Sequence, residues 1–242
     1  MIIDAHSKIG KIYKDDFYSY EELIKEMDEN NVDMSLVTCF PQNIDNEYIL
    51  QAFSKYPKRL LGLYTINPWK DDAGKEVKQA IEKGFKGIAL DPIAHGYSIG
   101  NLEILKDVLE VCEENKYLIW INTFSESFTA PVMIGGLAEK YKGVTFIMGH
   151  MGFNYDSSMA CKVAGEYENC YIETSGAMAI NFKRALNVCG SKKVLMATGR
   201  PDINYFPLEL ATIKEEFSAK EDYENVTYKN ISKILNLGGQ QW

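Results

Sequence analysis

Three polar side chains near the start of the chain have the types and the spacing to act at one place. Asp4, His6 and Lys8 follow an apolar pair at every second position. Because side chains alternate between the two faces of a β-strand, a strand over residues 2–8 would direct all three to the same side. The C-terminal ends of the strands of a parallel barrel present catalytic side chains, so this stretch is the first candidate for a functional site.

Four later apolar runs also end in polar residues. The stretches GIALDP, YLIWINT, VTFIMGHMG and CYIETSG carry at their matching ends Asp91, Asn122, His150 and Glu173. Arg200 follows the last apolar run, KVLMATG. A histidine is suited to general acid or base chemistry, because its ordinary pKa of about 6.5 lies near neutrality. If the strands are parallel, these side chains meet His6 and Lys8 at one mouth.

The elements that must position these residues alternate regularly along the chain. Strands are expected over residues 2–8, 34–40, 60–68, 87–92, 117–123, 144–152, 170–176 and 193–199. Amphipathic helices are expected between the strands. A capping box of Ser19 and Glu22 indicates where the first helix begins. Eight strand–helix pairs favour a closed (β/α)8 TIM barrel over a doubly wound open sheet or two domains. We expect residues 1–242 to form a single domain.

The composition narrows the class of partner. Of 242 residues, 46% are hydrophobic and 25% charged, and the formal charge is -8, which is typical of an ordinary globular protein. This acidic balance disfavours nucleic acid as a partner, and no apolar run approaches the roughly 20 residues that span a membrane. The five cysteines form no C-x-x-C pair. We therefore expect a cytoplasmic protein with a small-molecule substrate.

Several motifs carry a resemblance to a known family. The opening I-D-A-H, then G-F-K-G-I-A-L-D-P, V-T-F-I-M-G-H-M-G and Y-I-E-T-S-G, and a closing helix at Asn230 occur in the order and on the strands of amidohydrolases. The chain resembles the amidohydrolase-2 branch of metal-dependent hydrolases and decarboxylases. The resemblance implies a TIM barrel and activity on a small molecule, and relatives often form homodimers.

The family pattern also implies a metal, and this chain departs from it. The family holds a divalent ion, usually zinc, with two histidines on strand 1, one on strand 5 and an aspartate on strand 8. His6 is retained, but those other positions carry Lys8, Asn122 and Gly199. Asparagine is a poor zinc ligand, glycine offers none, and an ammonium repels a cation. We expect no metal cofactor; zinc would survive only in a reduced site of His6, His150 and Glu173, with Lys8 turned away.

The resulting hypothesis assigns the lost metal's charge to a lysine. Lys8, held by Glu173 or Asp91, would polarise a carbonyl or carboxylate, and His150 would act as general acid or base. His6 completes the catalytic set, while Asp91, Asn122, Glu173 and Arg200 would bind substrate. The predicted function is hydrolysis or decarboxylation of a small carboxylate- or lactone-type molecule with lost metal dependence.

Two other interpretations stay open at this point. The chain could be a catalytically inactive relative that binds a small ligand or a protein partner at the barrel mouth. The polar residues also have structural explanations: His6 could pack under the mouth, and Lys8 could form a salt bridge in the barrel wall. Asp202 could replace the missing strand-8 aspartate, or it could pair with Arg200.

Overall fold

The predicted strands form one parallel sheet that curves into a nearly closed barrel. The computed structural model describes residues 1–123 and 126–237. The eight strands follow one another around the barrel in chain order. They are β1 (Ile3–Lys8), β4 (Met34–Thr38), β5 (Leu60–Ile66), β6 (Gly87–Leu90), β7 (Leu118–Ile121), β8 (Thr145–Met148), β9 (Cys170–Glu173) and β10 (Val194–Leu195). The predicted (β/α)8 TIM barrel is confirmed.

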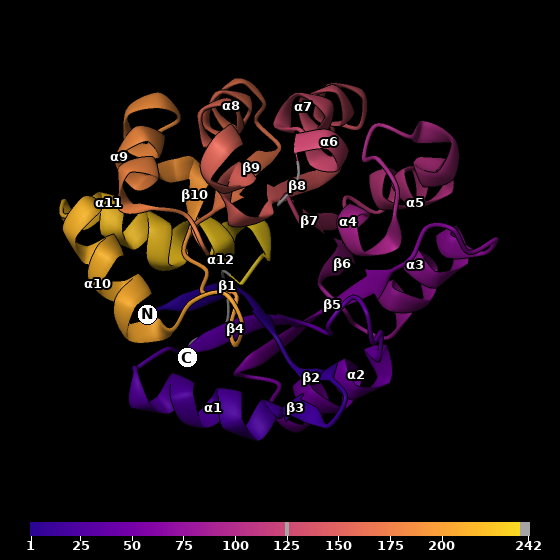
Figure 1. The fold of residues 1–242 in the computed structure, drawn as a ribbon, viewed down its shortest axis with the longest axis horizontal. Helices are drawn as coiled ribbons and strands as arrows, with labels where there is room; N and C mark the ends of the chain where they lie inside the picture. Colours follow the sequence, from indigo (N-terminus) through magenta and orange to yellow (C-terminus); the bar gives the residue numbers. More distant parts are fainter. Residues whose placement is uncertain (124–125, 238–242) are drawn as a thin grey trace.

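Helices surround the strands (Figure 1). The longer ones are α1 (Tyr20–Glu29), α2 (Asn46–Lys55), α3 (Ala73–Glu82), α5 (Leu102–Glu114), α7 (Pro131–Lys140), α8 (Phe153–Glu166), α9 (Ala179–Val188) and α10 (Phe206–Glu216). The predicted capping box is present at the start of α1, where Ser19 and Glu22 satisfy each other's backbone N–H groups. Within the described part of the chain, no helix is long and apolar enough to cross a membrane.

Apolar side chains fill the barrel interior on the side away from the C-terminal ends of the strands. They belong to alternate strand positions and include Ile3, Ala5, Met34, Leu36, Leu63, Leu118, Trp120, Ile147, Leu195 and Ala197. Buried Ile231 of α12 (Asn230–Ile234) packs against this interior cluster. A second and larger core lies between the strands and the helices. Because these side chains fill the interior, the polar residues that face it lie at the C-terminal ends of the strands.

The seam between the last and first strands is hydrogen-bonded through backbone beyond the short strand β10. Ala5 N–H donates to Met196 O at 2.8 Å, and Gly199 N–H donates to His6 O at 2.9 Å. Lys8 N–H donates to Arg200 O at 2.7 Å. The regular ladder of β10 therefore covers only part of the predicted range 193–199, but the chain continues alongside β1 to the mouth.

The first strand departs from regular alternation, and this places Asp4 outside the barrel. The register of β1 on β4 shifts between Asp4 and Ser7, while Ala5 packs in the interior. The Asp4 carboxylate accepts from Ser7 Oγ at 2.5 Å, Ser35 Oγ at 2.9 Å and Thr198 N–H at 2.8 Å. The prediction that Asp4 shares one side with His6 and Lys8 is wrong, because a bulge-like irregularity reverses the alternation.

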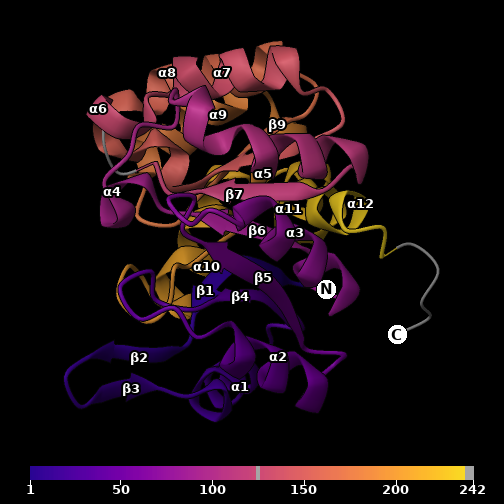
Figure 2. The ribbon, with the colours of Figure 1, turned by 90° about the vertical axis from the view of Figure 1, so that its right-hand side faces the viewer.

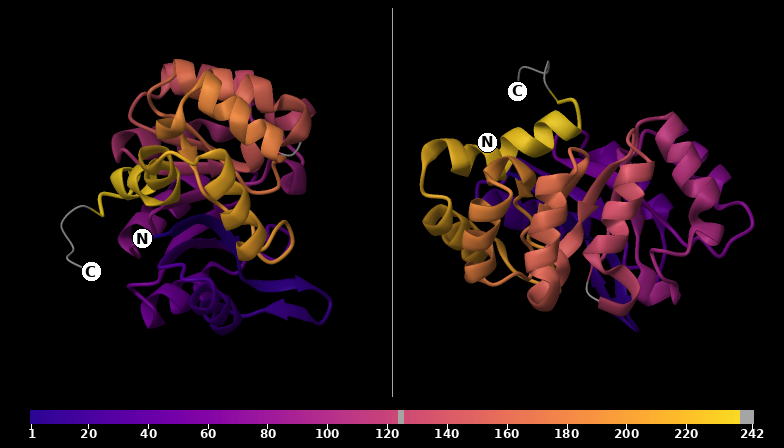
Figure 3. Two further views of the ribbon diagram at one scale, coloured as in Figure 1. Left: turned by 90° about the vertical axis from the view of Figure 1, so that its left-hand side faces the viewer. Right: turned by 90° about the horizontal axis from the view of Figure 1, so that it is seen from above.

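A hairpin that was not predicted extends the mouth side. Its strands are β2 (Gly10–Tyr13) and β3 (Asp16–Tyr18), which pair antiparallel. Figure 2 shows it on the same side as the short helices α4 (Pro92–His95) and α6 (Glu126–Thr129). The N-terminus and α12 lie on the opposite side (Figure 3). The mouth and the base of the barrel are thus formed by different parts of the chain.

Candidate active site

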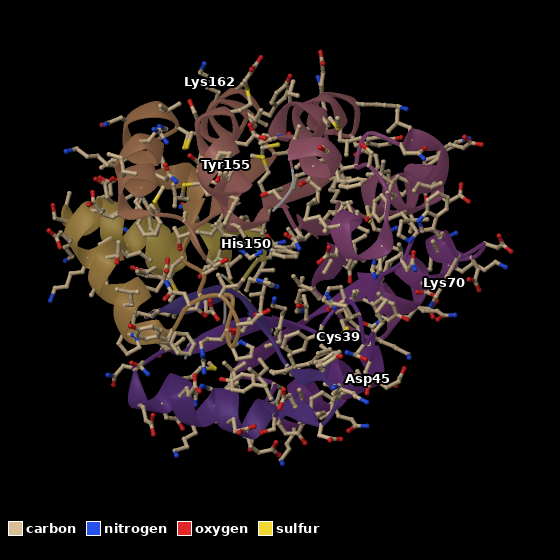
Figure 4. The ribbon with its side chains drawn as sticks, in the orientation of Figure 1. Cys39, Asp45, Lys70, His150, Tyr155 and Lys162 are labelled. Carbon is tan, nitrogen blue, oxygen red and sulfur yellow. The ribbon has the colours of Figure 1, made fainter. Side chains whose placement is uncertain are left out.

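A small cavity lies at the C-terminal ends of the strands. Its volume is about 20 Å³, which is room for about one water molecule. Of the predicted site residues, the ones that line it are His6, Lys8, Asp91, Asn122 and His150. Figure 4 shows His150 near the centre of the ring of helices, whereas Lys162 lies at its rim. Glu173 and Arg200 do not line the cavity.

His6 is fixed against an aromatic ring inside the barrel. Its imidazole stacks on Trp120 with ring centroids 3.9 Å apart and an interplanar angle of 21°. Nε2 lies 3.2 Å from Thr38 Oγ1. Burial lowers the pKa of His6 well below its ordinary value, and the nearby Lys8 ammonium lowers it further. His6 is therefore a neutral imidazole at physiological pH.

His150 occupies an unusual backbone conformation just after β8. Its φ is 58° and that of Met151 is 52°, both in the left-handed region that costs most residues about 1–2 kcal/mol. The turn Gly149–Gly152 begins with a glycine because a Cβ there would lie 2.5 Å from Trp120 Cζ2. This conformation directs the His150 backbone N–H to Glu173 Oε1 at 2.7 Å.

A serine connects the His150 ring to the buried Glu173 carboxylate. Ser175 Oγ donates to Glu173 Oε1 at 2.9 Å, and Ser175 N–H donates to Oε2 at 2.6 Å. Because this hydroxyl proton is committed to Glu173, Ser175 Oγ accepts from His150 Nδ1–H, 2.7 Å away. The lone pair of the neutral His150 ring is then on Nε2. Ser175 was not predicted as a site residue, although it stands in the Y-I-E-T-S-G motif.

Burial sets the protonation of this group. It lowers the pKa of His150 to about 3, with a further lowering by the Lys8 charge. Burial also raises the pKa of Glu173 to about 7, opposed by hydrogen bonds from His150 and Ser175. His150 Nδ1 lies 3.7 Å from Glu173 Oε1, but the neutral imidazole makes this a polar contact and not an ion pair.

Lys8 pairs with a residue on the loop after β10. Its Nζ donates to Asp202 Oδ2 at 2.8 Å and lies 5.4 Å from the centroid of the Phe40 ring. The side chain is 13% exposed, compared with 41% for Asp202. The prediction that Glu173 or Asp91 holds Lys8 is wrong, because backbone and side-chain donors occupy both of those carboxylates.

Asp91 and Asn122 form a second polar pair in the cavity wall. Asn122 Nδ2 donates to Asp91 Oδ2 at 2.8 Å. The other oxygen, Oδ1, accepts from Ala94 N–H at 2.9 Å and caps the start of α4. The two residues therefore lie together as predicted, in an arrangement that fixes the orientation of the amide.

Arg200 points away from the cavity. Its guanidinium donates to both Glu26 oxygens, at 2.7 and 2.5 Å, and lies over the Tyr18 ring. Such a bidentate pair satisfies the planar donor geometry of arginine. The interpretation that Asp202 pairs with Arg200 is wrong, since each has another partner, and the structure places the Arg200 side chain outside the site.

Comparison with known proteins identifies the family. The family model described as amidohydrolase matches residues 14–237. The chain belongs to the amidohydrolase family. No curated protein matches this amidohydrolase.

Solved structures share the fold at low sequence identity. A probable 2-pyrone-4,6-dicarboxylic acid hydrolase from Acinetobacter baumannii, with citric acid bound, is 15% identical with a TM-score of 0.75, covering 97% of this chain and 99% of that one. A 2,6-dihydroxybenzoate decarboxylase from Rhizobium is 15% identical with a TM-score of 0.77, covering 98% of each chain. A 5-carboxyvanillate decarboxylase mutant from Novosphingobium aromaticivorans, with bound manganese, is 16% identical with a TM-score of 0.76, covering 98% and 97%. These neighbours are hydrolases and decarboxylases of small carboxylates.

The residues of this amidohydrolase do not fit the metal centre that its family implies. Among the described residues, no three or more His, Cys, Asp or Glu side chains are grouped so as to hold a metal ion. Glu173, the third member of the expected reduced site with His6 and His150, does not line the cavity, and both of its oxygens accept protein hydrogen bonds. The Lys8 ammonium lines the same cavity as both histidines and would repel a cation there.

Proposed function

We propose that this amidohydrolase hydrolyses or decarboxylates a small carboxylate- or lactone-type molecule, using the Lys8 ammonium where relatives use a metal ion. The observation that carries the proposal is the placement of Lys8 beside two buried neutral imidazoles in the wall of one cavity. A fixed cation stabilises negative charge that develops on a carbonyl or carboxylate oxygen. The activities named for the structural neighbours support this substrate class.

In this mechanism His150 moves the proton. For hydrolysis, its Nε2 lone pair takes a proton from the water whose oxygen bonds to the carbonyl carbon, and the ring returns that proton to the oxygen that leaves when the C–O bond breaks. For decarboxylation, the ring takes a proton from solvent and gives it to the carbon whose bond to the departing carbon dioxide breaks. The pKa of about 3 is that of the cavity without an anion. A substrate carboxylate beside Lys8 offsets the lysine charge and raises the pKa of His150 toward the range in which acid–base transfer is efficient.

Ser175 and Glu173 are positioning residues in this scheme. The Ser175 hydroxyl fixes His150 Nδ1 as a donor, so the ring presents Nε2 for proton transfer. The Glu173 carboxylate fixes the direction of that hydroxyl and stabilises an imidazolium when one forms. Asp91 holds Asn122 in place to bind a polar group of the substrate.

A binding protein without turnover is the second candidate. It is favoured by the same departures that remove the metal ligands, at Lys8, Asn122 and Gly199. Both candidates bind a small molecule at the mouth. They differ in whether a bound ligand is consumed.

The test begins with a ligand screen and ends with a turnover assay. Thermal-shift screening against aromatic carboxylates and lactones finds ligands, and carbon dioxide release or ring opening is then followed with and without a metal chelator. We expect turnover that the chelator leaves unchanged and that falls about a hundredfold or more in Lys8→Met. Lys142→Met, at an exposed position before β8, is the matched control.

Three outcomes would count against the proposal. Activity that depends on added zinc or manganese would mean that a metal is used after all. Full activity in Lys8→Met would remove the role of the ammonium. Ligands that bind tightly but are never converted would favour the second candidate.

A further inference from the structure

Three residues that line the cavity each carry a buried polar atom with no hydrogen-bond partner among the described residues. The atoms are His6 Nδ1, Thr65 Oγ1 and Trp120 Nε1. The three residues are 1%, 2% and 4% exposed, and all line the cavity beside Lys8. A buried polar group without a partner costs about 1–3 kcal/mol. Such groups around one small space indicate a polar ligand that satisfies at least the donors among them.

The chemistry of these groups points to an acceptor. The indole N–H of Trp120 can only donate, and the hydroxyl of Thr65 can donate. The Lys8 ammonium has three N–H groups, and its one hydrogen-bond acceptor within the described part of the chain is Asp202. Asp91 is the carboxylate of the cavity wall, and both of its oxygens accept hydrogen bonds from the protein. An oxyanion is the ligand group that would accept from all of these donors.

The geometry of the wall is already fixed without a ligand. The Trp120 ring is held by its stacking on His6, and Gly149 leaves the space that its six-membered ring occupies. Thr65 lies in β5, so its backbone is held in the barrel ladder. Donors held by rigid elements bind a charged group without further ordering of the protein.

We propose that the cavity is a subsite for one carboxylate group, whose oxygens are bound by Lys8 Nζ, the Trp120 indole N–H and the Thr65 hydroxyl. The volume of about 20 Å³ has room for about one carboxylate oxygen and excludes an aromatic ring. The body of the ligand then lies outside the cavity, toward the hairpin and α4. This inference rests on the proposed function, because it specifies how the same site holds its substrate.

Formate is the probe, because it is a carboxylate with almost nothing attached. Isothermal titration calorimetry of sodium formate with the full chain measures the affinity, with methyl formate as the uncharged counterpart. Trp120→Phe keeps the stacked ring but removes the N–H donor, and Thr65→Val removes the hydroxyl at nearly constant volume. Each should weaken formate binding about tenfold, as expected for one hydrogen bond to a charged group. Methyl formate should not bind measurably.

Two further variants control for structure. Thr65→Ser retains the hydroxyl and should bind formate as the native chain does, whereas Lys142→Met should leave binding unchanged. Circular dichroism and the melting temperature of every variant show whether it folds. If Trp120→Phe proves unstable, the comparison of Thr65→Val with Thr65→Ser still decides the question.

The results separate this inference from the proposed function. Formate that binds equally to the native chain and to both Trp120→Phe and Thr65→Val, or no formate binding at all, would overturn the subsite and leave an ordered water as the partner of these atoms. If an aromatic carboxylate is still converted in a Lys8-dependent way, the proposed function survives that failure. Formate binding that follows the predicted pattern without turnover of any substrate would support the subsite and contradict the enzymatic proposal.

Discussion

At the scale of residues, the site depends on one cation and two imidazoles that it keeps neutral. Burial is the main cause of the low pKa of both histidines, and the Lys8 charge adds to it. His6, Lys8 and His150 could be predicted from their positions at strand ends, since parallel strands place such positions together. The partner of Lys8 could not, because Asp202 is 194 residues away and its loop conformation is not written in local sequence.

Replacing Lys8 by methionine should raise the pKa of His150. The variant removes the nearby positive charge that opposes protonation of the ring, while the burial remains. The pKa should therefore rise above about 3 but stay below its ordinary value. Long-range ¹H–¹⁵N NMR spectra recorded against pH measure it, with Lys142→Met as control. An unchanged His150 titration would show that the ammonium does not act on this ring.

Glu173 should make the wild-type chain lose stability as the pH rises. Its pKa is raised from 4.5 to about 7 in the folded state. Between these values the folded chain binds more protons than the unfolded chain, so the free energy of unfolding falls as pH increases through about 7. The loss attributable to this group is roughly 3 kcal/mol.

Glu173→Gln provides the comparison. The variant is destabilised at every pH, because an amide nitrogen faces a backbone donor. The difference in free energy of unfolding between the wild type and the variant should nevertheless be smaller at pH 8 than at pH 5. The wild type loses stability over this range, whereas the variant lacks the titrating group. Urea unfolding at the two pH values measures both free energies. A difference that is the same at both would mean that Glu173 does not titrate in this range.

At the scale of elements, irregular backbone places the functional groups. The irregularity in β1 puts Asp4 outside the barrel and leaves His6 inside, and the left-handed turn after β8 orients His150. The positions of the strands and helices could be predicted from the apolar residues. A strand that is buried on both faces is a continuous apolar run, and a helix that is buried on one face has apolar residues every three or four positions. The bulge, the turn and the hairpin have no such periodicity, and so they were missed.

Gly199, in the irregular segment after β10, is a position where a larger residue should destabilise the fold. Its φ is +62°, and a Cβ there would lie 2.8 Å from Ile203 Cβ. Gly199→Ala should therefore lower the free energy of unfolding by about 2–4 kcal/mol, through backbone strain and overlap. Gly136→Ala is the matched control, since nothing lies within 4 Å of its added Cβ in the exposed face of α7.

The control should be neutral or stabilising by about 0.5–1 kcal/mol, as expected for a helix-interior glycine. Thermal and urea unfolding compare the two variants. Equal stability of both would show that the segment after β10 relaxes freely. The same crowding opposes an aspartate at position 199, where the family resemblance implies a metal ligand.

At the scale of the whole molecule, the residues proposed to act on a substrate lie at one end of the barrel, and the residues that stabilise the fold by packing fill the other end. The mouth carries the polar residues, whereas the base is filled by apolar side chains and covered by α12. The alternation of eight strand–helix pairs was sufficient to predict this architecture, because few folds accommodate it. The way in which the C-terminal helices cover the base was not predictable, since it depends on contacts between distant parts of the chain.

Ile231 tests that separation. It is fully buried against the interior cluster, so Ile231→Ala should lower the free energy of unfolding by about 2–5 kcal/mol. Ile180→Ala, at a position that is 58% exposed on α9, should change it by less than about 0.5 kcal/mol. Because the cavity is formed at the other end of the barrel, ligand affinity measured at a temperature where the variant is folded should stay within about twofold of the wild type. A marked loss of affinity in folded Ile231→Ala would instead show that packing at the base determines the geometry of the mouth.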